Sequence, residues 1–131
     1  MSSAYAFGKT VAVPFEQAVL RITEALAAEG FGVLTEIDVA ATLKKKLGVD
    51  VTPYRILGAC NPAFAHRALE MEPEIGTLLP CNVVVRFEGA GRTRIDVMDP
   101  EAVLGLVGKK DLEPIAREVR ERLDRALKQV G

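Results

Sequence analysis

Hydrophobic side chains recur along the chain with two periods, and the changes between these periods divide it into elements. Residues 4–13 alternate bulky and small side chains, which is the period of a strand. Residues 14–29 repeat apolar side chains every three or four positions and predict an amphipathic helix that ends before Gly30. Residues 31–37 then predict a second strand.

The next segment predicts a short helix with a basic end. Asp38 suits its N-cap, and Val39, Leu43 and Leu47 would share one face. The three lysines at residues 44–46 cannot all point inward, so we interpret them as a solvated helix end. An anion-binding patch is the alternative.

Both cysteines and the only histidine fall in the central segment, residues 54–85. Residues 54–59 predict a third strand, because the run is short and rich in aromatic and β-branched side chains. Asn61 then suits an N-cap and Pro62 the first position of a helix, which ends at Met71 before a proline.

The last third of the chain predicts a hairpin and two more helices. Residues 83–97 alternate apolar and charged side chains around a glycine-containing turn at residues 89–91. One face of this hairpin would be apolar, and the charged face would carry cross-strand pairs. A short helix is predicted after Asp99, and Asp111 is predicted to cap the last helix, residues 112–130.

The order of these elements is strand, helix, strand, helix, strand, helix, hairpin, helix. It predicts an α+β fold in which a mostly antiparallel sheet of about five strands is packed by three to four helices. We expect one compact domain over residues 1–131, since no linker or repeat interrupts the pattern. A doubly wound fold fits less well, because no glycine-rich phosphate turn follows the first strand. The apolar face of the sheet could serve a homodimer.

Composition narrows the classes of partner and the compartment. Lys and Arg total 17 against 18 Asp and Glu, and aromatic residues are 5% of the chain with no Trp. Neither the nearly balanced charge nor the low aromatic content favours binding to nucleic acid. No apolar run is long enough for a membrane helix. The start of the chain shows no secretion signal. We therefore expect a cytoplasmic protein whose two cysteines are reduced.

The candidate chemistry lies in the central segment. A thiolate at Cys60 would be favoured by the N-terminus of the predicted helix, and the helical spacing of His66 and Glu70 lets them pair. Cys81 precedes the next strand in a second Cys-Asn pair, so both thiols would approach one end of the sheet if the strands are neighbours. The candidate site residues are Cys60, Asn61, His66, Glu70, Cys81 and Asn82.

Several uses of these residues stay open. The cysteines could simply fill the core, with His66 on a solvated helix face. A ligand-binding or assembly module without catalysis is the first functional hypothesis, because no nucleophile, base and orienting group are complete. The second is a thiol enzyme or sensor, with Cys60 reactive, His66 as base or cation and Cys81 resolving. The third is a soft-metal site of Cys60, Cys81 and His66, one ligand short of a closed zinc site.

Several stretches spread over most of the chain carry a family resemblance, namely residues 30–39, 45–50, 54–62, 72–73, 75–76, 79–85 and 98–100. They resemble a bacterial and archaeal family known as domain of unknown function 302. The resemblance implies a compact α+β domain, possibly dimeric, and the family carries no assigned activity, so it supplies no catalytic or binding residues.

Overall fold

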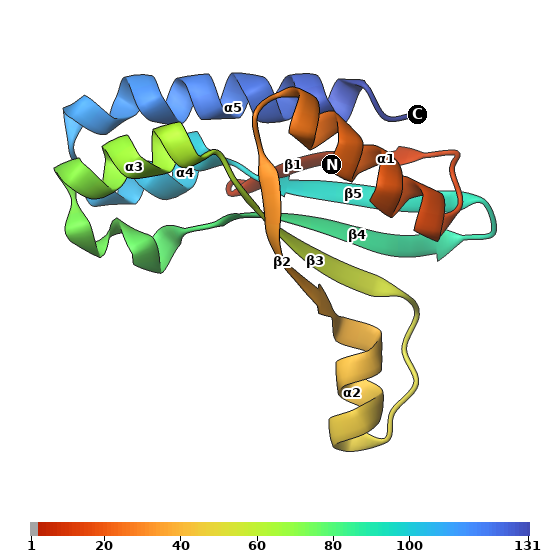
Figure 1. The fold of residues 1–131 in the computed structure, drawn as a ribbon. Helices are drawn as coiled ribbons and strands as arrows, with labels where there is room; N and C mark the ends of the chain where they lie inside the picture. The colour runs from red at the N-terminus through yellow and green to blue at the C-terminus, as the bar shows by residue number, and fades with distance from the viewer. Residues whose placement is uncertain (1–2) are drawn as a thin grey trace.

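A computed structural model describes residues 3–131 (Figure 1), so the prediction made for the start of the chain falls in part outside the described residues. Its elements keep the predicted order. They are β1 (Ala6–Val11), α1 (Phe15–Ala28), β2 (Gly32–Asp38), α2 (Val39–Leu47), β3 (Tyr54–Cys60), α3 (Pro62–Met71), the 3₁₀ turn η1 (Pro73–Leu78), β4 (Cys81–Gly89), β5 (Arg92–Met98), α4 (Pro100–Leu104), the 3₁₀ turns η2 (Gly105–Val107) and η3 (Lys110–Leu112), and α5 (Glu113–Lys128).

The five strands form one sheet in the order β1-β5-β4-β3-β2, and every neighbouring pair is antiparallel. The α+β prediction is confirmed. β1 and β2 lie at opposite edges, so α1, which connects them, runs across the sheet (Figure 1). The helix that connects the two edge strands therefore covers part of one face of the sheet.

One face of the sheet carries the core. Leu57, Val83 and Ile95 point to this face and are 0% exposed. They pack beneath α1 and α5, whose buried stripes include Ile22 and Leu123. The apolar residues that alternate along the strands and those spaced every three or four positions along these two helices therefore pack into one apolar layer.

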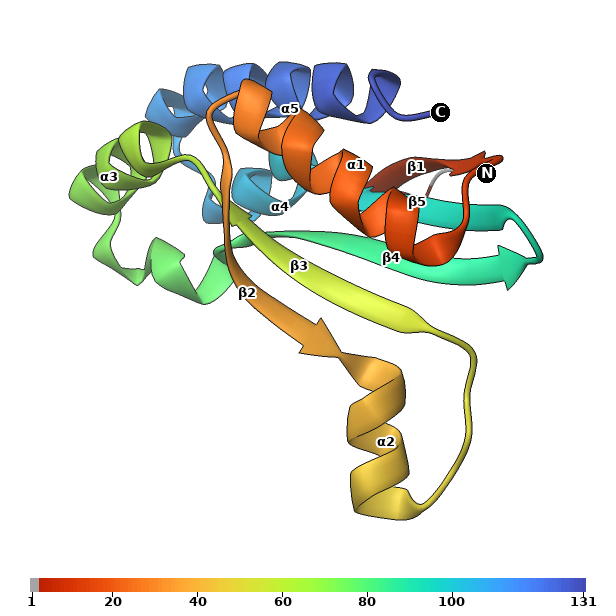
Figure 2. The ribbon, with the colours of Figure 1, turned by 45° about the vertical axis from the view of Figure 1, so that its right-hand side comes forward.

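The opposite face has no such cover. The strand register aligns Ile37, Ile56, Val84, Asp96 and Gly8 in one row across it. Of the helices labelled in Figures 1 and 2, only α2 lies on this side, and it extends away from the sheet instead of across it. We call this side the open face.

Two predictions at helix ends have different outcomes. The bounds predicted for α2 are confirmed, with Asp38 accepting a hydrogen bond from the Ala41 amide at 2.9 Å. The prediction that Asp111 caps the last helix is wrong, because Asp111 lies inside η3 and α5 begins at Glu113 without a side-chain cap. A proline at the start of α5 replaces that cap locally. None of the helices in residues 3–131 is long and apolar enough to cross a membrane.

Candidate functional site

The two cysteines meet at the end of the sheet under α3. Cys60 ends β3 and Cys81 begins β4, and both line the same small cavity of about 30 Å³. Its other walls are mainly apolar and include Phe31 and Phe64. A space of this size holds about one water molecule, which is too little for an ordinary small-molecule ligand.

Burial raises the pKa of both thiols. The pKa of Cys81 rises to about 12, first because it is buried and then because a charge on Cys60 would repel its own. Burial also raises the pKa of Cys60. The expected stabilisation of a Cys60 thiolate by the α3 N-terminus is therefore outweighed by loss of hydration. The Asn61 side chain already occupies that N-terminus, accepting from the Phe64 amide at 3.4 Å.

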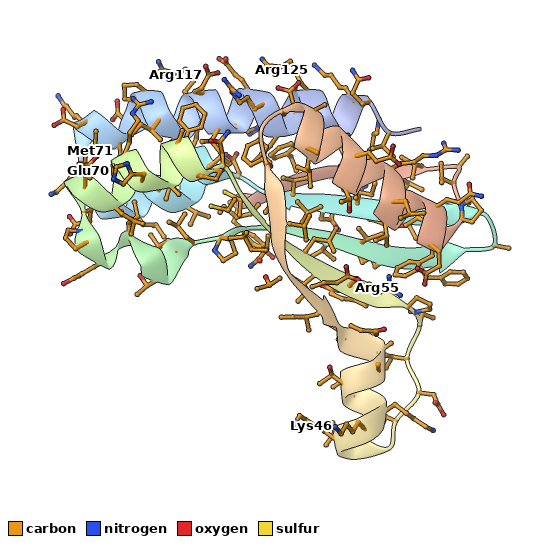
Figure 3. The ribbon with its side chains drawn as sticks, viewed as in Figure 1. Lys46, Arg55, Glu70, Met71, Arg117 and Arg125 are labelled. Carbon is orange, nitrogen blue, oxygen red and sulfur yellow. The ribbon has the colours of Figure 1, made fainter. Side chains whose placement is uncertain are left out.

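The remaining candidate residues lie elsewhere. The side chain of His66 is 76% exposed, and its Nε2 lies 3.8 Å from a Glu70 carboxylate oxygen, as their helical spacing predicts. Figure 3 shows Glu70 at the end of α3 that is far from the sheet. Asn82 follows Cys81 but points to the open face, because neighbouring residues of a strand alternate.

The metal alternative lacks its ligands. Among residues 3–131, no three side chains of His, Cys, Asp or Glu lie close enough together to hold a metal ion. His66 is turned to solvent while Cys81 is buried, so one ion would not reach both. The hypothesis of a thiol enzyme or sensor loses its base as well, because the exposed His66 does not line the cavity beside the two cysteines.

A larger hollow of about 610 Å³ lies on the open face, over β1, β5 and β4. Arg86 and Arg94 face each other across β4 and β5, and one carboxylate connects them. Arg86 Nε donates to Asp96 at 3.2 Å and Arg94 Nε donates to the other oxygen of Asp96 at 2.9 Å. Both guanidinium groups are thus held in fixed orientation beside an open space.

The second unusual feature of this side is the protruding segment of residues 38–53, which we call the arm. It contains α2, none of whose nine residues is buried. Its tip is closed by Gly48 in the left-handed conformation and by a Lys44–Asp50 ion pair of 3.1 Å. Figure 3 shows Lys46 near this tip and Arg55 where the arm meets the sheet.

Arg55 gathers three carboxylates at the root of the arm. Its guanidinium donates to both oxygens of Glu16, at 3.0 and 2.8 Å, and lies 3.5 Å from Glu36 and 3.9 Å from Asp38. One positive charge among three negative ones leaves the root acidic. The tip, by contrast, is basic.

Comparison with known proteins supports one assignment over nearly the whole chain. The sequence profile of the family described as domain of unknown function DUF302 matches residues 7–130. This chain belongs to the DUF302 family. Its fold is similar to the crystal structure of an uncharacterised conserved DUF302 protein from Bacillus stearothermophilus, with a TM-score of 0.90 and 33% sequence identity over 98% of this chain and 100% of that one. No curated protein matches the sequence.

The sequence contained a weak signal for the features that our site prediction missed in this DUF302 domain. Arg86, Arg94 and Asp96 alternate with the apolar residues of the hairpin, and we interpreted them only as surface pairs. Their shared carboxylate depends on the register between β4 and β5. The arm was recognised as a helix, but the pattern of Val39, Leu43 and Leu47 predicts an apolar face without showing that Val39 and Leu43 are only half-buried and Leu47 is exposed.

Proposed function

We propose that this DUF302 domain is a non-catalytic assembly module that pairs with a second copy of itself through the arm. The observation that carries this proposal is the lack of any buried residue in α2. Isolated helices of this length are marginally stable in water, and most helices gain their stability by packing an apolar face. A second chain would supply that packing.

The arm exposes the apolar surface that such a contact needs. Leu47 is 69% exposed, Val49 42% and Val51 46%, and Ile37 at the root is 48% exposed. Exposed apolar residues that gather in one place mark interaction sites more often than single ones do. The arm also has a defined shape, because its caps and the hydrogen bond from the Phe87 amide to the Pro53 carbonyl hold both ends.

Charge favours a second copy over an unrelated partner. The root has three carboxylates around Arg55, so its net charge is −2. The tip has three lysines at residues 44–46 and the carboxylate of Asp50, so its net charge is +2. Two arms packed antiparallel about a two-fold axis would place each basic tip on the acidic root of the other chain.

The contact would extend onto the neighbouring open face. Stable interfaces bury about 800 Å² on each partner, from about 20–30 residues. The arm alone has fewer residues than that, and Ile56 of β3, beside Ile37, continues its apolar surface toward the sheet. The pairing would therefore cover the arm and the free edge of β2, with the acidic root on the α1 side of that edge and Ile56 on the open face.

Charge-swapped chains test this pairing. The tip variant carries Lys45→Glu and Lys46→Glu, and the root variant carries Glu16→Lys and Glu36→Lys, so each would bring like charges together in its own homodimer. We expect the unchanged chain to be a dimer by sedimentation equilibrium, each variant to be a monomer, and an equimolar mixture of the two variants to form a heterodimer.

A control variant with Arg117→Glu and Lys128→Glu changes two exposed charges on α5, a helix on the side of the molecule away from the arm (Figure 1). We expect it to remain a dimer. The proposal is wrong if the unchanged chain is monomeric, or if the tip and root variants stay monomeric when mixed although each remains folded by circular dichroism.

A further inference from the structure

The guanidinium groups in the hollow of the open face have unused hydrogen-bonding capacity. Asp96 accepts only from the Nε atoms of Arg86 and Arg94. Within residues 3–131, the terminal nitrogens of these two arginines make no hydrogen bond to protein, and none of them is sealed from solvent. Each arginine thus presents donors to the hollow while its orientation is already fixed.

The local charge balance leaves one positive charge in excess. Arg86 and Arg94 share the single carboxylate of Asp96. Glu88 also borders the hollow, but it accepts from Thr10 at 2.8 Å and pairs with Arg92 at 3.5 Å. The side chain of Arg94 is only 13% exposed, so its charge is poorly hydrated and an anion placed there would be weakly screened.

The rest of the hollow is suited to an apolar body. Val84 and Met98 line it together with the arginines, and Tyr5 and Tyr54 line it as well. Asn82 adds one uncharged hydrogen-bonding group. A space of about 610 Å³ lies within the range of about 300–1,000 Å³ that is usual for small-molecule sites.

We infer that this hollow binds small carboxylates that carry an apolar body. The planar carboxylate would bind to the terminal nitrogens of Arg86 and Arg94, which suit bidentate contacts, and the apolar body would lie on Val84 between the tyrosines. A single excess positive charge favours a monoanion over a more highly charged ligand. The site is complete within one chain, so the inference does not depend on pairing through the arm.

A matched series of ligands tests both halves of this site. The probe is 4-phenylbutanoate, compared with the neutral 4-phenylbutanol, the cationic 4-phenylbutylamine and acetate, which lacks the apolar body. Binding is followed by chemical shifts of the backbone amides and of the arginine Nε groups. We expect saturable shifts at Tyr54, Asn82 and Val84 with the probe, and binding weaker by about tenfold or more with each of the other three.

Variants of the protein distinguish a specific contact of the carboxylate with Arg86 and Arg94 from nonspecific attraction of an anion to surface cations. Arg94→Gln should weaken binding of the probe by about tenfold or more, because a charged hydrogen bond is lost, and Arg86→Gln should do the same from the more exposed rim. Arg117→Gln is the control, since Arg117 is an exposed cation on α5, away from the hollow (Figure 3), and it should bind as the unchanged chain does.

Three results would each overturn the inference: equal binding of the alcohol and the acid, unchanged binding by both Arg86→Gln and Arg94→Gln, or shifts confined to residues outside the hollow. Sedimentation of the same samples shows whether pairing persists, so failure of the ligand site is distinguished from failure of the proposed assembly.

Discussion

The two faces of the sheet differ in what covers them. The covered face contains the buried cysteine of the candidate site, and the open face contains charged and apolar groups that solvent reaches. The covered face holds Cys81 at 7% exposed, in a core closed by α1 and α5. The open face holds two arginines beside a hollow and an arm without a buried residue. The thiol of Cys81 is thus packed in the core, while the two arginines and the arm of the open face contact solvent.

The largest expected effect compares two neighbouring residues of β3 that point to opposite faces. Leu57→Ala removes a side chain that is 0% exposed and should lower the free energy of unfolding by about 2–5 kcal/mol. Ile56→Ala, on the open face, should cost only about 1–2 kcal/mol in the Lys45→Glu/Lys46→Glu chain, which should be monomeric, because its side chain is partly hydrated within a single chain. Urea denaturation of both variants in that chain measures the difference. Equal losses there would mean that Ile56 is buried within the single chain.

The buried thiol should make the protein less stable at alkaline pH. The pKa of Cys81 is about 12 in the folded chain, against an ordinary value of 9.0, so the unfolded chain loses this proton first. Its contribution to stability is intact below the unfolded pKa and decreases above it, by about 1 kcal/mol between about pH 8 and about pH 10.

Urea denaturation at several pH values checks this expectation against Cys81→Ala. That variant should be less stable throughout but should lose stability more slowly above about pH 9. Parallel curves for the two proteins would show that Cys81 is not sealed in the folded state.

Loss of a helix cap should loosen the arm without unfolding the body. Asp38→Ala removes the acceptor for the Ala41 amide and should cost about 1 kcal/mol, confined to α2. Hydrogen exchange should become about fivefold faster at the amides of residues 41–47 and stay unchanged in β4. Asp111→Ala is the control, because Asp111 caps no helix. If protection fell across the sheet as well, the arm would not be an independent unit.

The smallest effect is expected at His66. Its ring is exposed and its partner Glu70 is exposed too, so His66→Ala should change the free energy of unfolding by less than about 0.5 kcal/mol. The rate at which iodoacetamide alkylates Cys60 should also stay the same, because the imidazole does not reach the cysteine cavity. A slower rate would connect the histidine to the thiol after all.

Local signals were sufficient for much of the fold. The caps at Asp38 and Asn61 were predictable, because a short polar side chain before an apolar repeat satisfies free amides within one turn. The start of α5 was not, since Asp111 offers the same local signal one residue too early and the chain forms a 3₁₀ turn there. A cap signal fixes a helix start only when the neighbouring packing agrees.

The candidate site was predictable only in part. The neighbouring positions of β3 and β4 bring Cys60 and Cys81 to one cavity, as their places at strand ends suggested. The exposure of His66 and the burial of Cys81 agree with the interpretation in which the cysteines fill the core and His66 lies on a solvated helix face. The sequence left the other interpretations open, because helical spacing relates His66 to Glu70 and says nothing about the sheet. The arginine pair was visible as a charged alternation, without the carboxylate that links it.

The sequence by itself determined where strands and helices form, which side of each is apolar, and the family of the chain, because periodicity and capping act over a few residues. The tertiary structure alone decided which face of the sheet α1 and α5 cover, that Cys81 is sealed, and that α2 stands apart. Burial depends on elements that are distant in sequence, so the same apolar stripe can form a core in α1 and remain unpaired in α2.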